Sequence, residues 1–286
     1  MRAVANALLW PVRRIGALLP DGWAGLARQL AVFIPFDIAY ELSRAFAQGG
    51  EQTALQHARD VVHAERVLGI YEEHAVQDWA LEAPTFVMEV AKFTYFQCQF
   101  TITFGFVIWV YIWRHEAYTL LRNCLFATFM LAVPGYIFYP TAPPRLLPSE
   151  GFIDPLASAT LNQQGTLVKL FGNPYAAMPS LHTATAILVG ITGVLVTRHL
   201  AVRAIWALYP GLVLFSIVAT ANHFFLDAVA GAGVLAVALV IVLSLHRRLD
   251  WSLAPLPASG DRSSTGTDRS SRPHADAPPG MRPSDR

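Results

Sequence analysis

The sequence predicts an all-α integral membrane protein: a six-transmembrane-helix bundle with a short helical extracytoplasmic segment and a disordered C-terminal tail. Two observations support this fold class. Hydrophobic residues make up 54% of the chain and charged residues only 14%, whereas about 25% of residues are charged in ordinary soluble domains. The hydrophobic residues also form blocks of about 20, the length that an apolar helix needs to cross a bilayer.

Three regions are expected along the chain. Residues 1–25 form an interfacial N-terminal segment, because Arg13 and Arg14 follow its apolar run instead of preceding it as they would in a signal peptide. Residues 26–250 form the transmembrane domain. Residues 251–286 contain mainly Ser, Pro, Asp, Arg and Gly. Such a composition cannot offset the entropy that is lost on ordering, so these residues are expected to form a disordered cytoplasmic tail.

Six apolar segments account for the predicted bundle. They are residues 26–46, 86–113, 123–139, 178–197, 204–221 and 225–245. The first segment contains Asp37, Glu41 and Arg44 at helical spacing. It therefore either crosses the bilayer with these residues facing the protein interior, or lies as an amphipathic helix in the membrane interface. Residues 49–83 are polar, with apolar side chains at helical spacing, which predicts one or two short helices outside the bilayer.

The orientation of the bundle follows from its arginines. An even number of spans places both termini on one side, and the loops on that side hold most of the arginines that precede the tail. Cytoplasmic loops are enriched in Lys and Arg. The chain is therefore predicted to be a multi-pass protein of the cell membrane with both termini in the cytoplasm. Arg145, His182 and His223 then lie at the opposite, extracytoplasmic face.

One stretch of the chain carries the residues suited to chemistry. Residues 178–182 (Met-Pro-Ser-Leu-His) begin one predicted helix, and His223 and Asp227 begin the last one. About forty mostly apolar residues lie between these motifs, which is enough for two crossings of about 20 residues each. His182 and His223 are therefore expected at the same membrane face.

His223 and Asp227 are four residues apart, so they share one face of a helix. The carboxylate can accept the imidazole N–H, fix the tautomer and leave the other ring nitrogen free to attack a substrate. The same spacing also fits an interfacial histidine with an incidental acid one turn away.

Two further features point to phosphate. Pro179 suits the first turn of a helix, where the N–H groups of Ser180 and the next residues would point out of the helix end and could bind phosphate. Arg145 follows a proline-rich run beyond a predicted span and could hold phosphate oxygens bidentately, and Lys169 is a weaker candidate. Each feature alone also fits an ordinary helix start or a contact with lipid headgroups. Together with the two histidines and the carboxylate, they predict a phosphoryl-transfer site.

At these residues the chain resembles the type 2 phosphatidic acid phosphatase superfamily. Pro179-Ser180-x-His182 and His223-x3-Asp227 are similar to its second and third signatures. The Ala-Ala-Met-Pro-Ser-Leu-His sequence at 176–182, with Pro-Thr-Ala-Pro-Pro-Arg at 140–145, is most similar to its inositol phosphorylceramide synthase-like (inositolphosphotransferase) branch. The resemblance runs from about the first span to Arg248 and implies a six-helix membrane bundle that needs no metal.

The resemblance also implies a role for each matching residue. His223 would be the nucleophile that forms a phosphohistidine, and Asp227 its orienting partner. His182 would be the acid that protonates the leaving alcohol. Arg145 and the backbone around Ser180 would bind the phosphate.

Two positions depart from the superfamily pattern. Phe138 stands where the first signature has a lysine seven residues before its arginine, and Ile217 stands where the third signature has an arginine after a serine. Two phosphate-binding cations are therefore missing. Their absence favours transfer of the phospho group to an alcohol over simple hydrolysis.

The predicted protein is a metal-independent lipid phosphatase or phosphotransferase that acts on a lipid-linked phosphate through a phosphohistidine, without a cofactor. The phospho group would pass to an inositol- or lipid-type alcohol or to water. The near-balanced charge of +1 gives no basic field that would favour a nucleic-acid partner.

Three alternatives stay open at the level of sequence. One is a lipid phosphate phosphatase without transferase activity. A second is a non-catalytic lipid transporter whose path uses the ionisable residues of the predicted spans: Asp37, Glu41, Glu89 and Lys92. A third is a metal-dependent hydrolase with His182, His223 and Asp227 as ligands. The sequence has no CxxC or HExxH pattern to support a zinc site.

Overall fold

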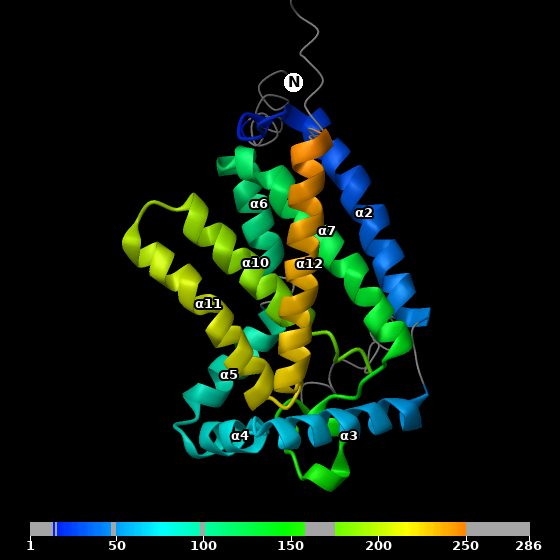
Figure 1. The fold of residues 1–286 in the computed structure, drawn as a ribbon. Helices are drawn as coiled ribbons and strands as arrows, with labels where there is room; N and C mark the ends of the chain where they lie inside the picture. Colours follow the sequence, from blue (N-terminus) through cyan, green and yellow to red (C-terminus); the bar gives the residue numbers. More distant parts are fainter. Residues whose placement is uncertain (1–13, 15, 47–49, 98–100, 158–174, 250–286) are drawn as a thin grey trace, which may run out of the picture. The chain divides into compact units, whose positions relative to one another are not determined.

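The described part of the chain is helical. In the computed structural model the described residues are 14, 16–46, 50–97, 101–157 and 175–249, and they form nine α-helices and no strand (Figure 1). The α-helices are α2 (Gly22–Phe46), α3 (Glu51–Leu68), α4 (Glu73–Glu82), α5 (Phe86–Gln97), α6 (Thr103–Trp113), α7 (His115–Phe138), α10 (Leu181–Val196), α11 (Leu200–Ala219) and α12 (Phe225–Leu249). The all-α prediction is confirmed for these residues. The predicted tail at 251–286 lies outside them.

Three described helices are long and apolar enough to cross a membrane: α7, α11 and residues Phe225–His246 of α12. Their mean hydropathies are 1.4, 1.8 and 2.7. Two further apolar helices are shorter, with 11 residues in α6 and 16 in α10. These helices support a membrane protein, while the number of six spans stays a prediction.

Local sequence explains where the helices depart from the predicted segments. The segment 86–113, predicted as one span, forms α5 and α6, which the structure describes on either side of residues 98–100. Arg114 has non-helical backbone angles and separates α6 from α7, so α7 begins well before the predicted start at residue 123. α10 begins only after its capping residue, Ser180.

The first predicted span, α2, packs against α7 through aromatic side chains. Phe33 and Phe36 both contact the ring of Phe126, with centroids 4.7 and 4.0 Å apart, and Tyr40 is buried on the same side. Asp37 is exposed. The prediction that Asp37 faces the protein interior is therefore wrong, because the aromatic residues at helical spacing occupy the inward face of α2.

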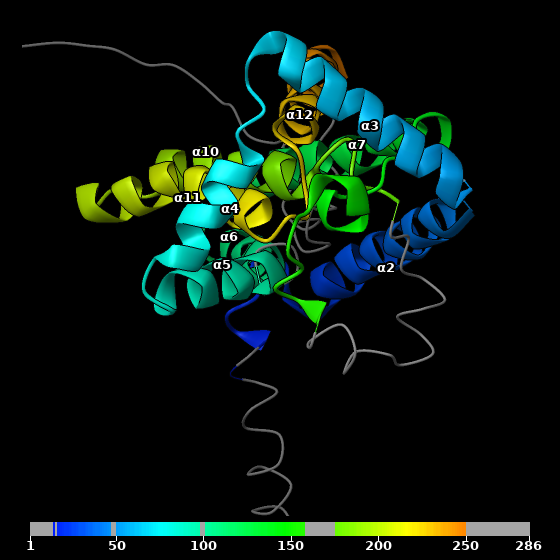
Figure 2. The same cartoon turned by 90° about the horizontal axis from the view of Figure 1, so that it is seen from below.

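The polar segment at residues 49–83 forms two helices, α3 and α4, as predicted. They lie across the end of the bundle where α12 begins (Figures 1 and 2). α3 ends at Gly69, whose φ of 69° is the left-handed conformation that glycine adopts easily. One face of α3 packs against the loop after α7 and the start of α12. The buried residues of this cluster are Ala54, Ala58, Val61, Val62, Ala142, Leu147 and Phe224.

Candidate active site

The start of α10 is fixed by its capping residue and by α12. The Ser180 hydroxyl accepts a long hydrogen bond from the Thr183 N–H at 3.4 Å, and the Ser180 N–H donates to the Asp227 carbonyl oxygen at 2.9 Å. Ser180 is fully buried. The prediction that the Ser180 N–H is free to bind phosphate is therefore wrong, because this amide joins α10 to α12. Pro179 precedes the capping residue instead of lying in the first helical turn.

The turn between α11 and α12 presents His223 to the site. α11 ends at Ala219, and the Ile217 carbonyl oxygen then accepts the N–H groups of both Asn222 and His223, at 2.9 and 3.2 Å. Ala221 has a φ of 52°, in the left-handed region that non-glycine residues rarely adopt. This compact turn reverses the chain within a few residues and brings His223 to the start of α12.

The structure brings His223 and Asp227 into direct contact. The Nδ1 atom of His223 lies 3.3 Å from Oδ2 of Asp227, and the same oxygen accepts the Phe224 N–H at 2.9 Å. Asp227 is fully buried and His223 is 5% exposed. A carboxylate in this position favours the tautomer with the proton on Nδ1, which leaves Nε2 without a proton.

His182 lies between two rings. Its imidazole centroid is 5.4 Å from that of His223, and it stacks on Tyr95 of α5 with centroids 4.9 Å apart and an interplanar angle of 18°. The two histidines that are separated by α10 and α11 along the chain thus meet at one end of the bundle. Sequence reasoning missed Tyr95, because nothing in the pattern of α5 distinguishes it from an ordinary apolar-face residue.

Arg145 is held beside the turn that carries His223. It lies in a short 3-10 helix, η2 (Pro144–Leu146), and its backbone N–H donates to the Ala221 carbonyl at 3.0 Å. Its Nη1 donates to Oδ1 of Asn222 at 2.8 Å, and its Nε lies 3.6 Å from Oδ2 of Asp154. The structure therefore places a guanidinium next to the candidate nucleophile. Lys169, the weaker candidate, lies outside the described residues.

Two glutamates also reach the start of α12, and sequence reasoning assigned them no chemistry. Glu65 of α3 accepts the Leu226 N–H at 2.7 Å, and Glu73 of α4 accepts the Phe225 N–H at 2.9 Å. Both side chains are fully buried. The sequence held a signal for Glu65, since it falls at helical spacing on the same face as the apolar residues Val61 and Val62.

Gln77 forms a further polar contact from α4. Its Nε2 donates to the carbonyl oxygens of Ile153 and Ala219 at 2.9 and 3.1 Å, and its Oε1 accepts the Ile153 N–H at 2.9 Å. This one amide joins α4 to the end of α11 and to the loop that contains Asp154. The loop that holds Arg145 is thereby fixed at both of its ends.

A family model described as the PAP2 superfamily matches residues 59–241. The chain belongs to this superfamily. The matched region runs from α3 into α12 and contains all five predicted site residues. The match does not distinguish the synthase-like branch.

One solved structure similar to this PAP2 protein is that of Aquifex aeolicus LpxE. The two are 20% identical with a TM-score of 0.46, and the similarity covers 62% of this chain and 94% of that chain. No curated protein shows significant sequence similarity to the chain.

The described residues of the PAP2 protein contain no group of three or more His, Cys, Asp and Glu side chains arranged to hold a metal ion. His182, His223 and Asp227 accordingly do not form a facial triad. The imidazole of His223 is turned toward Asp227 by its Nδ1 atom. The geometry thus fits an oriented nucleophile better than a metal ligand set.

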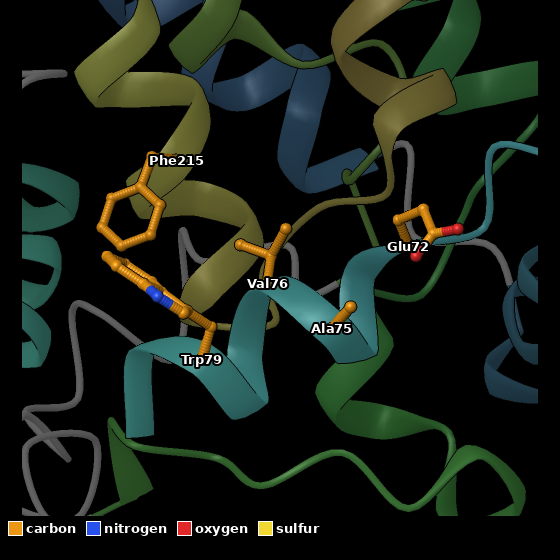
Figure 3. A pocket seen from close by; sticks show the side chains of 5 residues that line it. All are labelled: Glu72, Ala75, Val76, Trp79 and Phe215. Carbon is orange, nitrogen blue, oxygen red and sulfur yellow. The ribbon is translucent and has the colours of Figure 1, made fainter. Parts of the chain in front are cut away.

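A groove of 460 Å³ lies between α4 and α11, away from the site (Figure 3). Trp79 and Phe215 meet edge to face across it, with ring centroids 5.8 Å apart. Glu72, Ala75 and Val76 complete its lining. None of the predicted site residues belongs to this groove.

Proposed function

We propose that this PAP2 protein is a membrane enzyme that cleaves a lipid-linked phosphoester through a phosphohistidine on His223 and passes the phospho group to an alcohol or to water. The observation that carries the proposal is the orientation of His223. Its Nδ1 is hydrogen-bonded to the buried Asp227, while the ring of His182 lies 5.4 Å away on the facing helix. An oriented base and a second titratable group beside it are the parts that covalent catalysis needs.

The proposed first step forms the covalent intermediate. Nε2 of His223 attacks the phosphorus atom, and the bond between phosphorus and the leaving alcohol oxygen breaks. Asp227 stabilises the positive charge that develops on the imidazole of His223. Protonated His182 gives its proton to the leaving oxygen, so that a neutral alcohol departs.

The second step reverses these roles. Neutral His182 takes the proton of an acceptor hydroxyl, whose oxygen attacks the phosphohistidine and releases Nε2 of His223. Arg145 neutralises charge on the phosphate oxygens in both steps, since its guanidinium lies beside the turn that carries His223. The acceptor decides whether the reaction is a transfer or a hydrolysis.

We favour an alcohol as the acceptor because two cations of the family pattern are replaced. Phe138 lies at the end of α7 with 81% of its surface exposed, and Ile217 is fully buried in the apolar core. Neither position can bind phosphate. A pocket with fewer cations and less bound water favours an organic hydroxyl over water, as expected for an inositol phosphorylceramide synthase-like enzyme.

The transporter alternative gains no support from the ionisable residues on which it was based. Asp37 is exposed on α2. Glu89 of α5 forms an ion pair with Lys92 and is itself 60% exposed. These side chains lie on the outer surface of the helices, so they do not line a path through the bundle.

We also propose that the site opens away from the cytoplasm. The polar helices α3 and α4 lie at the end of the bundle that holds the site, and the first described residues lie at the other end (Figure 1). Arg14, Arg28 and Arg114 belong to that other end, as expected for a cytoplasmic face.

The test uses full-length protein purified in detergent, a panel of phosphate-containing lipids and chelator throughout, with and without inositol. His223→Ala is the control variant. We expect wild type to form a new phosphodiester and His223→Ala to form none. Release of inorganic phosphate alone would assign a phosphatase instead. If neither product forms, or if His223→Ala matches wild type, the catalytic role of His223 is wrong.

A further inference from the structure

Two acidic side chains that the proposed reaction does not use hold the first turn of α12. Glu73 accepts the N–H of Phe225, and Glu65 accepts the N–H of Leu226. The first amides of a helix have no partner within the helix and must be satisfied by other groups. Here α3 and α4 supply those groups, directly before Asp227 in the chain.

The pair formed by Glu65 and Glu73, called the acid pair below, holds one proton between its two carboxyl groups. The two groups lie against each other, and each has its Oε2 atom buried with no donor among the described residues. One shared proton satisfies both oxygens. Burial, together with the neighbouring Glu73 carboxyl and the charge of Asp227, raises the pKa of Glu65 to about 9, so the proton is retained at neutral pH.

We propose that Glu65 and Glu73 are positioning residues of the reaction, which share one proton and hold the first turn of α12 so that Asp227 stays on His223. This inference rests on the proposed function of His223. Leu226 directly precedes Asp227, so a displaced first turn moves the carboxylate and the imidazole together. A displacement of about 1 Å at a reacting group can lower the rate by about 100-fold.

The surroundings of the acid pair make its charge state matter. From α12 it faces Asp227, which is bonded to His223, and Tyr71 in the turn between α3 and α4 is also within the field of Glu73. The charges that act on Glu65 are both negative. Loss of the shared proton therefore adds a further negative charge beside Asp227 and forces the carboxyl groups apart.

The experiment compares variants of the full-length protein with a lipid phosphate that wild type converts. Glu65→Gln imitates the shared proton permanently, because its amide oxygen can accept from Leu226 and its NH₂ group can donate to Glu73. Its kcat should stay close to that of wild type at neutral pH. Glu65→Leu removes the acceptor and should lower kcat by about 100-fold with little change in KM.

The decisive measurement is the ratio of kcat for Glu65→Gln to kcat for wild type, from about pH 6 to about pH 10. Ionisations of the catalytic histidines affect both proteins and cancel in this ratio. Wild type loses the shared proton near pH 9, whereas glutamine does not ionise, so the ratio should rise several-fold above that pH. Glu72→Gln changes an exposed acid next to the pair, and its ratio should stay near one throughout.

A flat ratio for Glu65→Gln in an active enzyme would overturn this inference and leave the proposed function intact. So would a Glu65→Gln variant that folds but is as inactive as Glu65→Leu. A wild-type protein that converts none of the lipids would overturn the proposed function itself, and the positioning role with it. If Glu65→Leu does not fold, the comparison of Glu65→Gln with wild type still decides the matter.

Discussion

At the scale of single residues, Asp227 joins more parts of the site than any other residue described above. Its Oδ2 accepts from the His223 ring and from the Phe224 backbone, and its carbonyl oxygen accepts the Ser180 N–H. Because it is fully buried, water cannot replace these partners. One residue therefore sets the histidine tautomer and also holds α10 against α12.

The first prediction concerns the charge of Asp227. Asp227→Asn keeps the shape and an acceptor oxygen but removes the negative charge that stabilises the imidazole as Nε2 bonds to phosphorus. We expect kcat to fall by about 10³- to 10⁴-fold, as for the corresponding change in a Ser-His-Asp triad. Initial rates measure the loss, and thermal unfolding in detergent checks that the variant is folded. A folded variant with wild-type kcat would show that Asp227 does not serve His223.

At the scale of elements, the contact between α10 and α12 depends on a glycine. A Cβ atom at Gly231 would overlap the backbone of Ser180, including its carbonyl oxygen. Two positions further along α12, a Cβ at Gly233 would meet nothing within 4 Å. The absence of a side chain at Gly231 lets the helix approach the chain segment that carries His182, which keeps the two histidines close.

The second prediction compares these two glycines. Gly231→Ala should destabilise the protein by about 1–3 kcal/mol, because the overlap forces the helices apart. It should also lower kcat, since His182 moves away from His223. Gly233→Ala should stabilise the helix by up to about 1 kcal/mol, because alanine is the better helix former. Unfolding midpoints and initial rates measure both effects, and equal behaviour of the two variants would contradict the packing argument.

At the scale of the whole molecule, the sequence predicted the meeting of the two histidines but not the groups that support them. Two apolar blocks of known length suffice to return His223 to the face of His182. Asn222, Glu73 and Gln77 act through contacts between distant elements, which no periodic pattern encodes. The exposed position of Asp37 was also missed, because the face that α2 buries depends on the aromatic residues of α7.

The third prediction concerns stability and pH. The raised pKa of Glu65 means that the folded protein retains a proton that the unfolded chain loses above about pH 4.5. The stabilisation is therefore fully present below that pH and is lost as the pH rises toward about 9. Unfolding midpoints in detergent should fall across this range more steeply for wild type than for Glu65→Gln, with Glu72→Gln following wild type. Parallel curves for wild type and Glu65→Gln would contradict a shared proton.

The hydrogen bonds of the acid pair also set the order in which the molecule can become competent. Glu65 and Leu226 are 161 residues apart along the chain, and Glu73 and Phe225 are 152 apart. During synthesis, the segment with both glutamates leaves the ribosome long before the turn with His223. The acid pair must therefore wait for its partners, and the nucleophile is oriented only after the last helix has joined the earlier ones. Assembly of the site is in this way tied to completion of the bundle.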